Sequence, residues 1–318
     1  MKVLLWHVHG SYTTALVQGG HEYFIPRLPD RGPDGRGRAL TWHWPASAVE
    51  VGPGEAAELD LDVVILQRPE ELDGLCERWL GGRRPGRDLP AIYLEHNAPQ
   101  GRVTEMRHPA ADRPELTLVH VTHFNDLFWD AGATPTRVIE HGILDPGYRY
   151  DGTLPRAAAA INEPVRRGRV TGTDLLERLG RSVPIDLFGI GAGELGGVED
   201  PPQESFHRDL ARRRVYLHPI RWTSLGLTLL EAMHLGMPVV ALGTTEVPEA
   251  VPPQAGVVST DVEKVEAALR LFVCDPDAAR TCGQAARKAA VARYGLERFL
   301  SDWDALLLEL AAESELAA

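Results

Sequence analysis

The stretch of sequence that decides the fold is Val215-Tyr-Leu-His-Pro-Ile-Arg-Trp-Thr-Ser-Leu-Gly-Leu-Thr-Leu-Leu-Glu-Ala-Met-His-Leu-Gly-Met-Pro-Val-Val-Ala241. Its first residues are an apolar run typical of a buried strand, and residues 227–235 carry apolar side chains at helical spacing. A second apolar run at 238–242 follows the helix. This strand–helix–strand order predicts a parallel βαβ unit, in which ligands bind beyond the carboxyl ends of the strands.

The loop between the first strand and the helix has the composition of an anion site. Thr223 or Ser224 is placed to cap the helix, and Gly226 lets a ligand approach bare backbone. Unpaired amides of the first turn, together with the helix dipole, favour a diphosphate there. Glu231 lies farther along the helix among apolar neighbours, where a carboxylate needs a partner. The spacing allows a ribose diol or a neighbouring arginine as that partner.

The same alternation extends through the chain and predicts two α/β domains. In the first half, strands are predicted at 3–9, 61–66, 91–94, 116–121 and 137–140, and helices near 70–80 and 125–131. The second half adds strands at 158–161, 185–188 and 214–217, helices at 173–179 and 206–213, and closing helices at 262–272, 276–294 and 296–310. Residues 145–155 carry two prolines and two glycines and are the predicted linker.

Composition and charge exclude several classes of protein. The chain has 318 residues, of which 44% are hydrophobic and 25% charged, as in ordinary globular proteins. A net charge of -12 argues against nucleic acid or an anionic membrane as partner. The three cysteines, Cys76, Cys274 and Cys282, form no metal-binding pair. Since no apolar run is long enough to span a bilayer and the N-terminus lacks a secretory signal, we expect a cytoplasmic protein.

Residues 226–241, followed by Val247-Pro-Glu-Ala-Val251, resemble the signature of the retaining GT-B glycosyltransferases of the family-4 type. In that family the second Glu of an E-x7-E motif binds the donor ribose, and Glu231 stands at its position. The resemblance implies that the backbone near Gly226 and Leu227 takes the donor diphosphate. The first Glu of the motif, which engages the donor sugar, falls on Thr223, whose side chain is shorter and neutral.

The segment from Asn162 to Leu176 resembles the family's Gly-Arg…Lys-Gly segment, whose two cations clamp the donor phosphates. Arg166 fits the Arg position, and Thr171 stands where the Lys is expected. Arg167 or Arg169 would therefore supply the second charge, unless this arginine run is simply a solvated surface turn. Glycines 189, 191 and 193 resemble the glycine turn of the family's second domain, which places Gly189 at the donor.

The first half carries the residues expected near the acceptor and the reacting sugar. His96 resembles a family histidine that lies near that sugar, and it is the predicted catalytic residue; a loop histidine satisfied by its neighbour Asn97 or by backbone groups is the alternative. His7 and His9 are expected on one side of the first strand, facing the acceptor or cleft region with Gly10, Ser11 and Asn97. His141 stands where the family has an Asn.

The residues and the resemblance together predict an α/β protein of the GT-B type, with two Rossmann-like doubly wound domains facing a central cleft. The acceptor-side domain is expected at 1–150, joined by a last helix at about 297–318, and the donor-binding domain at 151–296. The expected reaction transfers a sugar from a UDP-sugar or GDP-sugar donor to an acceptor, with retention of configuration at the anomeric carbon. Because no DxD carboxylate pair is present near the diphosphate site, neither a metal nor a further cofactor is expected. A sugar-nucleotide epimerase or hydrolase, and a binding protein without catalysis, are the alternatives.

Overall fold

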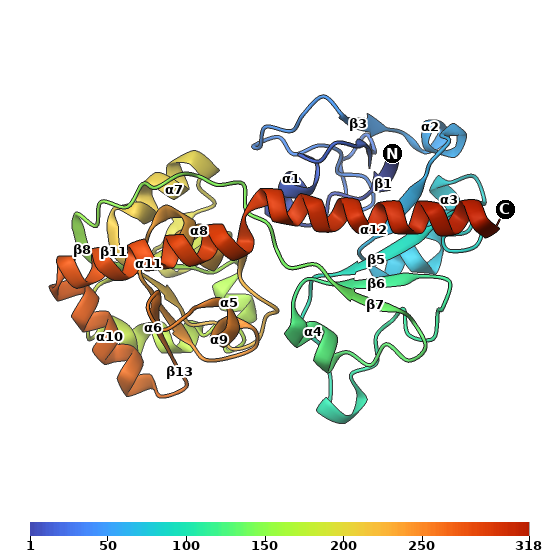
Figure 1. The fold of residues 1–318 in the computed structure, drawn as a ribbon. Coiled ribbons are helices and arrows are strands. Elements are labelled where there is room, and N and C mark those ends of the chain that lie inside the picture. Colours follow the sequence, from blue (N-terminus) through green and yellow to red (C-terminus); the bar gives the residue numbers. More distant parts are fainter. Residues whose placement is uncertain (318) are drawn as a thin grey trace. The chain divides into compact units, whose positions relative to one another are not determined.

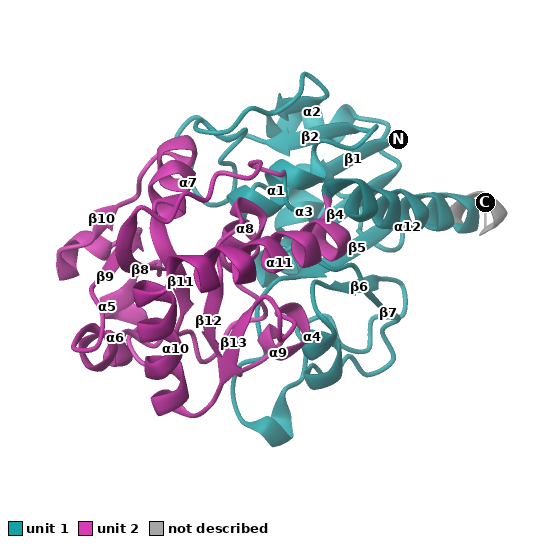
Figure 2. Cartoon of the chain, turned by 60° about the vertical axis from the view of Figure 1, so that its left-hand side comes forward, with its two compact units in different colours: residues 1–144, 296–318 teal, residues 145–295 magenta. Residues whose placement is uncertain are grey.

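The computed structural model describes residues 1–317, with side chains through residue 313. The described chain divides into two compact units, which Figure 2 draws in different colours. Unit 1 comprises Met1–Leu144 and the chain from Leu296 onward, and unit 2 comprises Asp145–Gly295. The sequence placed the first boundary after residue 150. Residues 145–150 belong to unit 2, where the backbone amides of Arg149 and Tyr150 donate to the carbonyl of Leu235 at 3.1 and 3.0 Å.

Unit 1 is built on a seven-stranded parallel sheet in the order β3-β2-β1-β4-β5-β6-β7. Its strands are β1 (Lys2–Leu5), β2 (Glu22–Pro26), β3 (Ala48–Val51), β4 (Val63–Leu66), β5 (Ala91–Glu95), β6 (Thr117–His120) and β7 (Thr136–Val138). The chain runs from β1 to one edge and then returns to fill the other side of the sheet (Figure 1). This is a doubly wound order, and its switch point lies at the carboxyl ends of β1 and β4.

Unit 2 repeats this plan with six parallel strands in the order β10-β9-β8-β11-β12-β13. Its strands are β8 (Leu154–Ala160), β9 (Ile185–Gly189), β10 (Val198–Glu199), β11 (Arg213–His218), β12 (Val239–Leu242) and β13 (Gly256–Ser259). Counted from β8, the order is the 3-2-1-4-5-6 of the Rossmann fold. The switch point of unit 2 therefore lies at the carboxyl ends of β8 and β11.

Helices connect the strands and pack on the sheets. Those of unit 1 are α1 (Gly10–Leu16), α2 (Pro53–Glu58), α3 (Cys76–Trp79), α4 (His123–Phe128) and α12 (Leu296–Ala317). Those of unit 2 are α5 (Pro164–Arg167), α6 (Thr173–Gly180), α7 (Gln203–Ala211), α8 (Leu227–Leu235), α9 (Val247–Ala250), α10 (Val262–Cys274) and α11 (Pro276–Tyr294). No helix within the described residues combines the length and the apolar character needed to cross a membrane.

Strands that are buried along their whole length lie at the centre of each core. Every residue of β4, β5 and β12 is buried, as expected for parallel strands covered on both faces. In unit 2, α8 is buried from Leu229 to Leu235, so it packs as a central helix and its polar residues lie in the interior. This burial makes Glu231 and His234 unusual, because each needs a partner inside the protein.

Several sequence predictions were wrong in detail. The first strand ends at Leu5 and does not reach His9, so strand periodicity does not orient the two histidines. The helix predicted at 70–80 breaks at Gly74, whose φ of 98° lies in the left-handed region, and only α3 continues. Strands β2, β3 and β13 were not predicted, because turn-rich segments flank each of these short runs. The bounds of α8 and α11 agree with the predicted ranges.

The last helix, α12, packs on unit 1. Its Trp303 indole donates to the Tyr12 hydroxyl at 3.1 Å, and His21 Nε2 lies 2.9 Å from Asp304 Oδ1. The Arg298 guanidinium donates to the backbone carbonyl of His141 at 2.6 Å. These contacts tie the end of the chain to α1 and to the segment that follows β7.

Candidate functional site

The unit 2 switch point presents the start of a helix that no side chain caps. Strand β11 ends at His218, a loop follows, and α8 begins after Gly226, the N-cap residue. The prediction that Thr223 or Ser224 is the N-cap residue was wrong, because they lie three and two residues before Gly226, which has no side chain to offer. The Leu229 amide donates to the Gly226 carbonyl at 3.0 Å, so the amides of Leu227 and Thr228 are the candidates for a ligand, and the helix dipole favours an anion there.

Gly226 has a packing reason as well as a ligand-binding one. A Cβ atom at this position would lie 2.6 Å from Cε1 of His218, closer than real contacts allow. Gly226, Leu227 and Thr228 are each half-buried, so the helix start is reachable from solvent. The strand end and the helix start are thus in direct contact, with bare backbone at the point that the sequence assigned to a diphosphate.

The three arginines of the 162–176 segment have different partners. Arg166 is exposed and forms an ion pair with Glu163, with Nε 2.9 Å from Oε1, and Arg169 lies 3.3 Å from Asp174. Arg167 is half-buried and makes no side-chain hydrogen bond or ion pair with any described residue. Burial and the neighbouring Arg166 lower the pKa of Arg167 more than the attraction of Glu163 raises it.

The arginine segment packs on the loop between β11 and α8. Arg221 of that loop donates to Asp174 through both terminal nitrogens, at 2.5 and 3.0 Å, and to the carbonyl of Arg169 at 2.7 Å. The Thr171 hydroxyl is used inside the segment, where it donates to the Gly168 carbonyl at 3.1 Å. Thr171 is fully buried, so it does not replace the missing lysine. The charge available for a phosphate is that of Arg167.

The glycine turn after β9 is already occupied by a side chain of the protein. The backbone amides of Gly191 and Gly193 donate to the carboxylate of Glu199, at 2.7 and 3.0 Å. A Cβ at Gly189 would lie 2.5 Å from the Ile161 carbonyl oxygen, and its φ is 132°. Gly189 is therefore required for close packing of β9 on β8. This packing explains the glycine without any contact to a nucleotide-sugar donor.

Glu231 has an internal partner, and it is a histidine. The carboxylate is 5% exposed, and its Oε2 lies 3.4 Å from Nε2 of His207 on α7. The side-chain amide of Gln203 lies 2.7 Å from the same ring nitrogen. The sequence had allowed an arginine in this place. The chain of Gln203, His207 and Glu231 links α7 to the helix that begins at Gly226.

In unit 1 the switch point holds a cluster of rings around His96. The His96 ring lies 4.2 Å from that of His9 and 4.6 Å from that of Tyr12, between centroids. The His141 ring lies 5.7 Å from that of Tyr12. His96 is 8% exposed, and burial together with His9 and His141 lowers its pKa well below the ordinary value. The cluster is therefore uncharged at neutral pH.

Gln67, at the carboxyl end of β4, fixes the protonation of His96. The Gln67 side-chain amide nitrogen donates to the Trp6 carbonyl at 2.6 Å, and a carbonyl can only accept. The Gln67 side-chain oxygen must then face Nε2 of His96, 3.0 Å away, so Nε2 carries the proton. His96 is held by Gln67 and by its ring neighbours.

The other predicted unit 1 residues are spread around this cluster. His7 Nδ1 lies 3.0 Å from the Gly37 carbonyl oxygen, and the His7 ring packs on that of Trp44. Gly10 and Ser11 begin α1 and are half-buried. Asn97 is exposed, and its backbone amide donates to Glu95 at 2.6 Å. His9 thus packs on His96, whereas His7 packs on Trp44.

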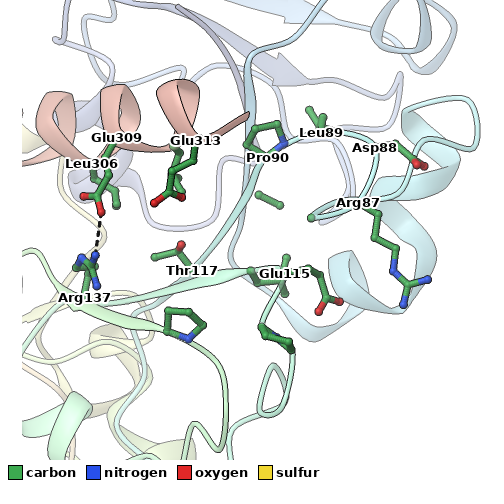
Figure 3. Close-up of a pocket in the computed structure, with 16 residues that line it drawn as sticks. Arg87, Asp88, Leu89, Pro90, Glu115, Thr117, Arg137, Leu306, Glu309 and Glu313 are labelled. Carbon is green, nitrogen blue, oxygen red and sulfur yellow. Dashed lines mark hydrogen bonds and ion pairs between the residues drawn. The ribbon is translucent and has the colours of Figure 1, made fainter. Parts of the chain in front are cut away.

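A cavity of about 490 Å³ lies elsewhere in unit 1 (Figure 3). It is lined by the segments that precede β5, β6 and β7 and by the last turns of α12. Arg137 and Glu309 cross it with an ion pair of 3.0 Å. Because this cavity is at the amino ends of the strands, it is not placed as ligand sites in doubly wound sheets are. Among the described residues no group of three or more His, Cys, Asp or Glu side chains is arranged to hold a metal ion.

Comparison with solved structures identifies the architecture. Sucrose-phosphate synthase from Thermosynechococcus elongatus superposes with a TM-score of 0.72 at 15% identity, covering 98% of this chain and 99% of that one. The fold is GT-B. HepE from Anabaena, solved in complex with UDP, has a TM-score of 0.66 at 14% identity and covers 98% of this chain and 100% of its own. A third GT-B structure, TarM from S. aureus in complex with UDP and other ligands, has a TM-score of 0.63 at 13% identity and covers 77% of this chain and 55% of its own.

A sequence family matches part of this GT-B chain. Residues 200–289 match the family model for glycosyl transferases group 1. The matched range begins directly after β10, ends within α11 and includes the β11–α8 loop, Glu231 and His207. No curated protein matches the sequence at a significant level.

Two residues at the switch points escaped the sequence analysis, although a simple signal marks them. Gln67 directly follows β4, and His218 ends β11. Polar residues at the carboxyl ends of buried parallel strands lie where ligands bind, so both residues could have been predicted as site candidates. His207 had no such signal, because its link to Glu231 depends on how α7 packs on α8.

Proposed function

We propose that this protein is a glycosyltransferase whose donor is a nucleoside diphosphate sugar. The observation that carries the proposal is the uncapped start of α8 at the unit 2 switch point, with the buried carboxylate of Glu231 about one turn along the same helix. The match of residues 200–289 to glycosyl transferases group 1 supports this class. Structural neighbours were solved with UDP and with UDP-glucose, so UDP is the first nucleotide to test.

In this proposal each part of the donor has a partner in unit 2. The diphosphate lies at the amides that follow Gly226, and Arg167 contributes the unpaired positive charge. The ribose hydroxyls donate to Glu231, whose position His207 holds. Because the helix start and Arg167 neutralise the leaving diphosphate, the reaction is proposed to need no metal ion.

The proposed reaction breaks the bond between the anomeric carbon and the phosphate oxygen and forms one to an acceptor hydroxyl oxygen. The acceptor proton passes to the departing phosphate, so no separate base is required and the configuration at the anomeric carbon is retained. His96, held by Gln67 as the Nε2–H form, is proposed to contact the reacting sugar. This is the role that the family resemblance implies for it.

The proposal is tested by incubating the protein with UDP-glucose, with and without a panel of sugar and polyol acceptors, in the presence of EDTA. We expect UDP release that depends on an acceptor, and an axial anomeric bond in the product by proton NMR. Release of UDP and free glucose without acceptor would identify a hydrolase. Binding of UDP with no turnover would identify a binding protein, and both results would overturn the transferase proposal.

A further inference from the structure

The unit 2 switch point contains a buried histidine whose polar atoms have no partner. His218, at the carboxyl end of β11, is 1% exposed, and neither of its ring nitrogens has a hydrogen-bond partner among the described residues. A buried polar group without a hydrogen-bond partner destabilises the folded protein. Such groups are rare in folded proteins, and a bound ligand that completes their hydrogen bonds is one explanation for them.

The position of the ring points to the start of α8. A Cβ at Gly226 would lie 2.6 Å from Cε1 of His218 and 3.4 Å from both Nδ1 and Nε2. Cε1 is bonded to both nitrogens, so the ring edge that carries them faces the N-cap residue. No side chain caps this helix. An imidazole whose nitrogens have no hydrogen-bond partner among the described residues therefore lies at the N-terminus of α8.

The chemistry of the ring at neutral pH follows from its burial. Burial lowers the pKa of His218 to about 4, so the imidazole is neutral and offers one N–H donor and one acceptor. An anion at the helix start accepts hydrogen bonds from the backbone amides, and its oxygens can accept from the imidazole N–H as well.

We propose that His218 is a phosphate-binding residue, which donates a ring N–H to an oxygen of the diphosphate held at the N-terminus of α8. The inference rests on the proposed function, because the diphosphate is that of the proposed donor. His218 then adds a donor that carries no charge, beside the charge of Arg167. The residue stands at the switch point of the sheet, between β8 and β11, where doubly wound sheets place their ligands.

The test replaces His218 by Phe, which keeps the ring and removes both nitrogens. Since the substitution removes two buried nitrogens that lack hydrogen-bond partners, the melting temperature of the free protein should be unchanged or higher. The affinities for UDP and for pyrophosphate, measured by calorimetry on the full chain, should fall about tenfold, and His218→Gln should recover part of the loss because its amide still donates. The control is His120→Phe in unit 1, where the ring is 0% exposed and both nitrogens also lack a hydrogen-bond partner among the described residues, with Asp126 3.9 Å from Nε2.

The outcomes separate this inference from the proposed function. If the unsubstituted protein binds UDP and His218→Phe binds it equally well, His218 only fills space and the inference is overturned, whereas the proposed function stands. If pyrophosphate binds in a His218-dependent way and UDP binds no better than pyrophosphate, the inference is supported and the nucleotide donor is overturned. Binding of neither probe overturns both.

Discussion

At the switch point of unit 1 neutral rings pack on one another, whereas that of unit 2 presents the start of a helix and a run of arginines. The unit 1 edge is a neutral cluster in which Gln67 holds His96 and rings pack on rings. The unit 2 edge has Gly226 as the N-cap residue of α8, and the arginine segment that packs on the β11–α8 loop contains Arg167, which makes no side-chain hydrogen bond or ion pair with a described residue. Both units have the same strand order, so topology fixes where a ligand binds and side chains fix which ligand.

The difference assigns separate tasks to the two units. An anion binds most favourably where backbone amides and a cation can donate hydrogen bonds to it. This favours binding of the diphosphate to unit 2. A cluster of neutral rings binds apolar faces and single hydroxyl groups, as a sugar offers. Four changes would break or sharpen this division.

The largest effect is expected from acid, and it should fall on unit 1. Burial lowers the pKa of His120 to about 4, and burial, with His9 and Arg298 nearby, lowers that of His141 to about 3. In the unfolded chain both bind a proton near pH 6.5, so their contribution to stability is complete above that pH. It is lost as the pH falls from 6.5 toward 4, by about 1.4 kcal/mol per pH unit for each histidine.

Urea unfolding at pH 7 and pH 5, with hydrogen exchange to assign the signal to each unit, measures this slope. We expect unit 1 to lose protection before unit 2. His141→Phe keeps the ring beside Tyr12 and should flatten the slope, and an unchanged slope in this variant would contradict the assignment.

The second effect is on phosphate binding. Arg167→Ala should weaken UDP affinity about 10- to 100-fold, since it removes a charge-assisted hydrogen bond to the diphosphate. Arg166→Ala and Arg169→Ala are matched controls, because both side chains are exposed and paired with acidic neighbours. Calorimetry should show less than about a threefold change for either. Equal losses in all three variants would mean that the segment acts as a diffuse positive patch.

The third effect separates ribose from phosphate. Glu231→Ala should weaken UDP binding about tenfold, because the ribose loses an ionised acceptor, and should leave pyrophosphate binding unchanged. Comparing the two ligands by calorimetry controls for a general disturbance of α8. If UDP affinity is fully retained, Glu231 does not bind the ribose and its bond to His207 is structural.

The smallest effect concerns unit 1 chemistry. His96→Ala should spare UDP affinity and slow transfer about five- to tenfold, as expected for one lost hydrogen bond to the reacting sugar. Gln67→Ala should slow transfer less, because His96 keeps its ring neighbours. Steady-state kinetics with UDP-glucose give both values. Unchanged turnover in His96→Ala would remove this residue from the reaction.

The sequence predicted the parts of the molecule that depend on local pattern. The bounds of α8 and α11 follow from helical spacing, and the two-domain GT-B architecture from the alternation and the family signature. Short strands such as β2 and β3 were missed because their apolar runs lie between turn-rich segments. The break at Gly74 was missed because helical spacing on both sides masks a residue with left-handed φ.

At the site, residue types were predictable but their partners were not. The sequence named Arg166, Arg167 and Arg169 together, and only folding places Glu163 and Asp174 beside two of them. It expected a cap from Thr223 or Ser224, yet the helix starts after Gly226, where a side chain would collide with the His218 ring. Long-range pairs such as Glu231 with His207 depend on helix packing, which local spacing does not encode.

Hydrogen exchange of the full chain with and without saturating UDP tests the central claim most directly. The account predicts new protection in unit 2 at residues 163–172 and 218–231, which contain Arg167, His218 and Glu231. Protection confined to unit 1, or no protection anywhere, would contradict the assignment of the donor diphosphate to the start of α8.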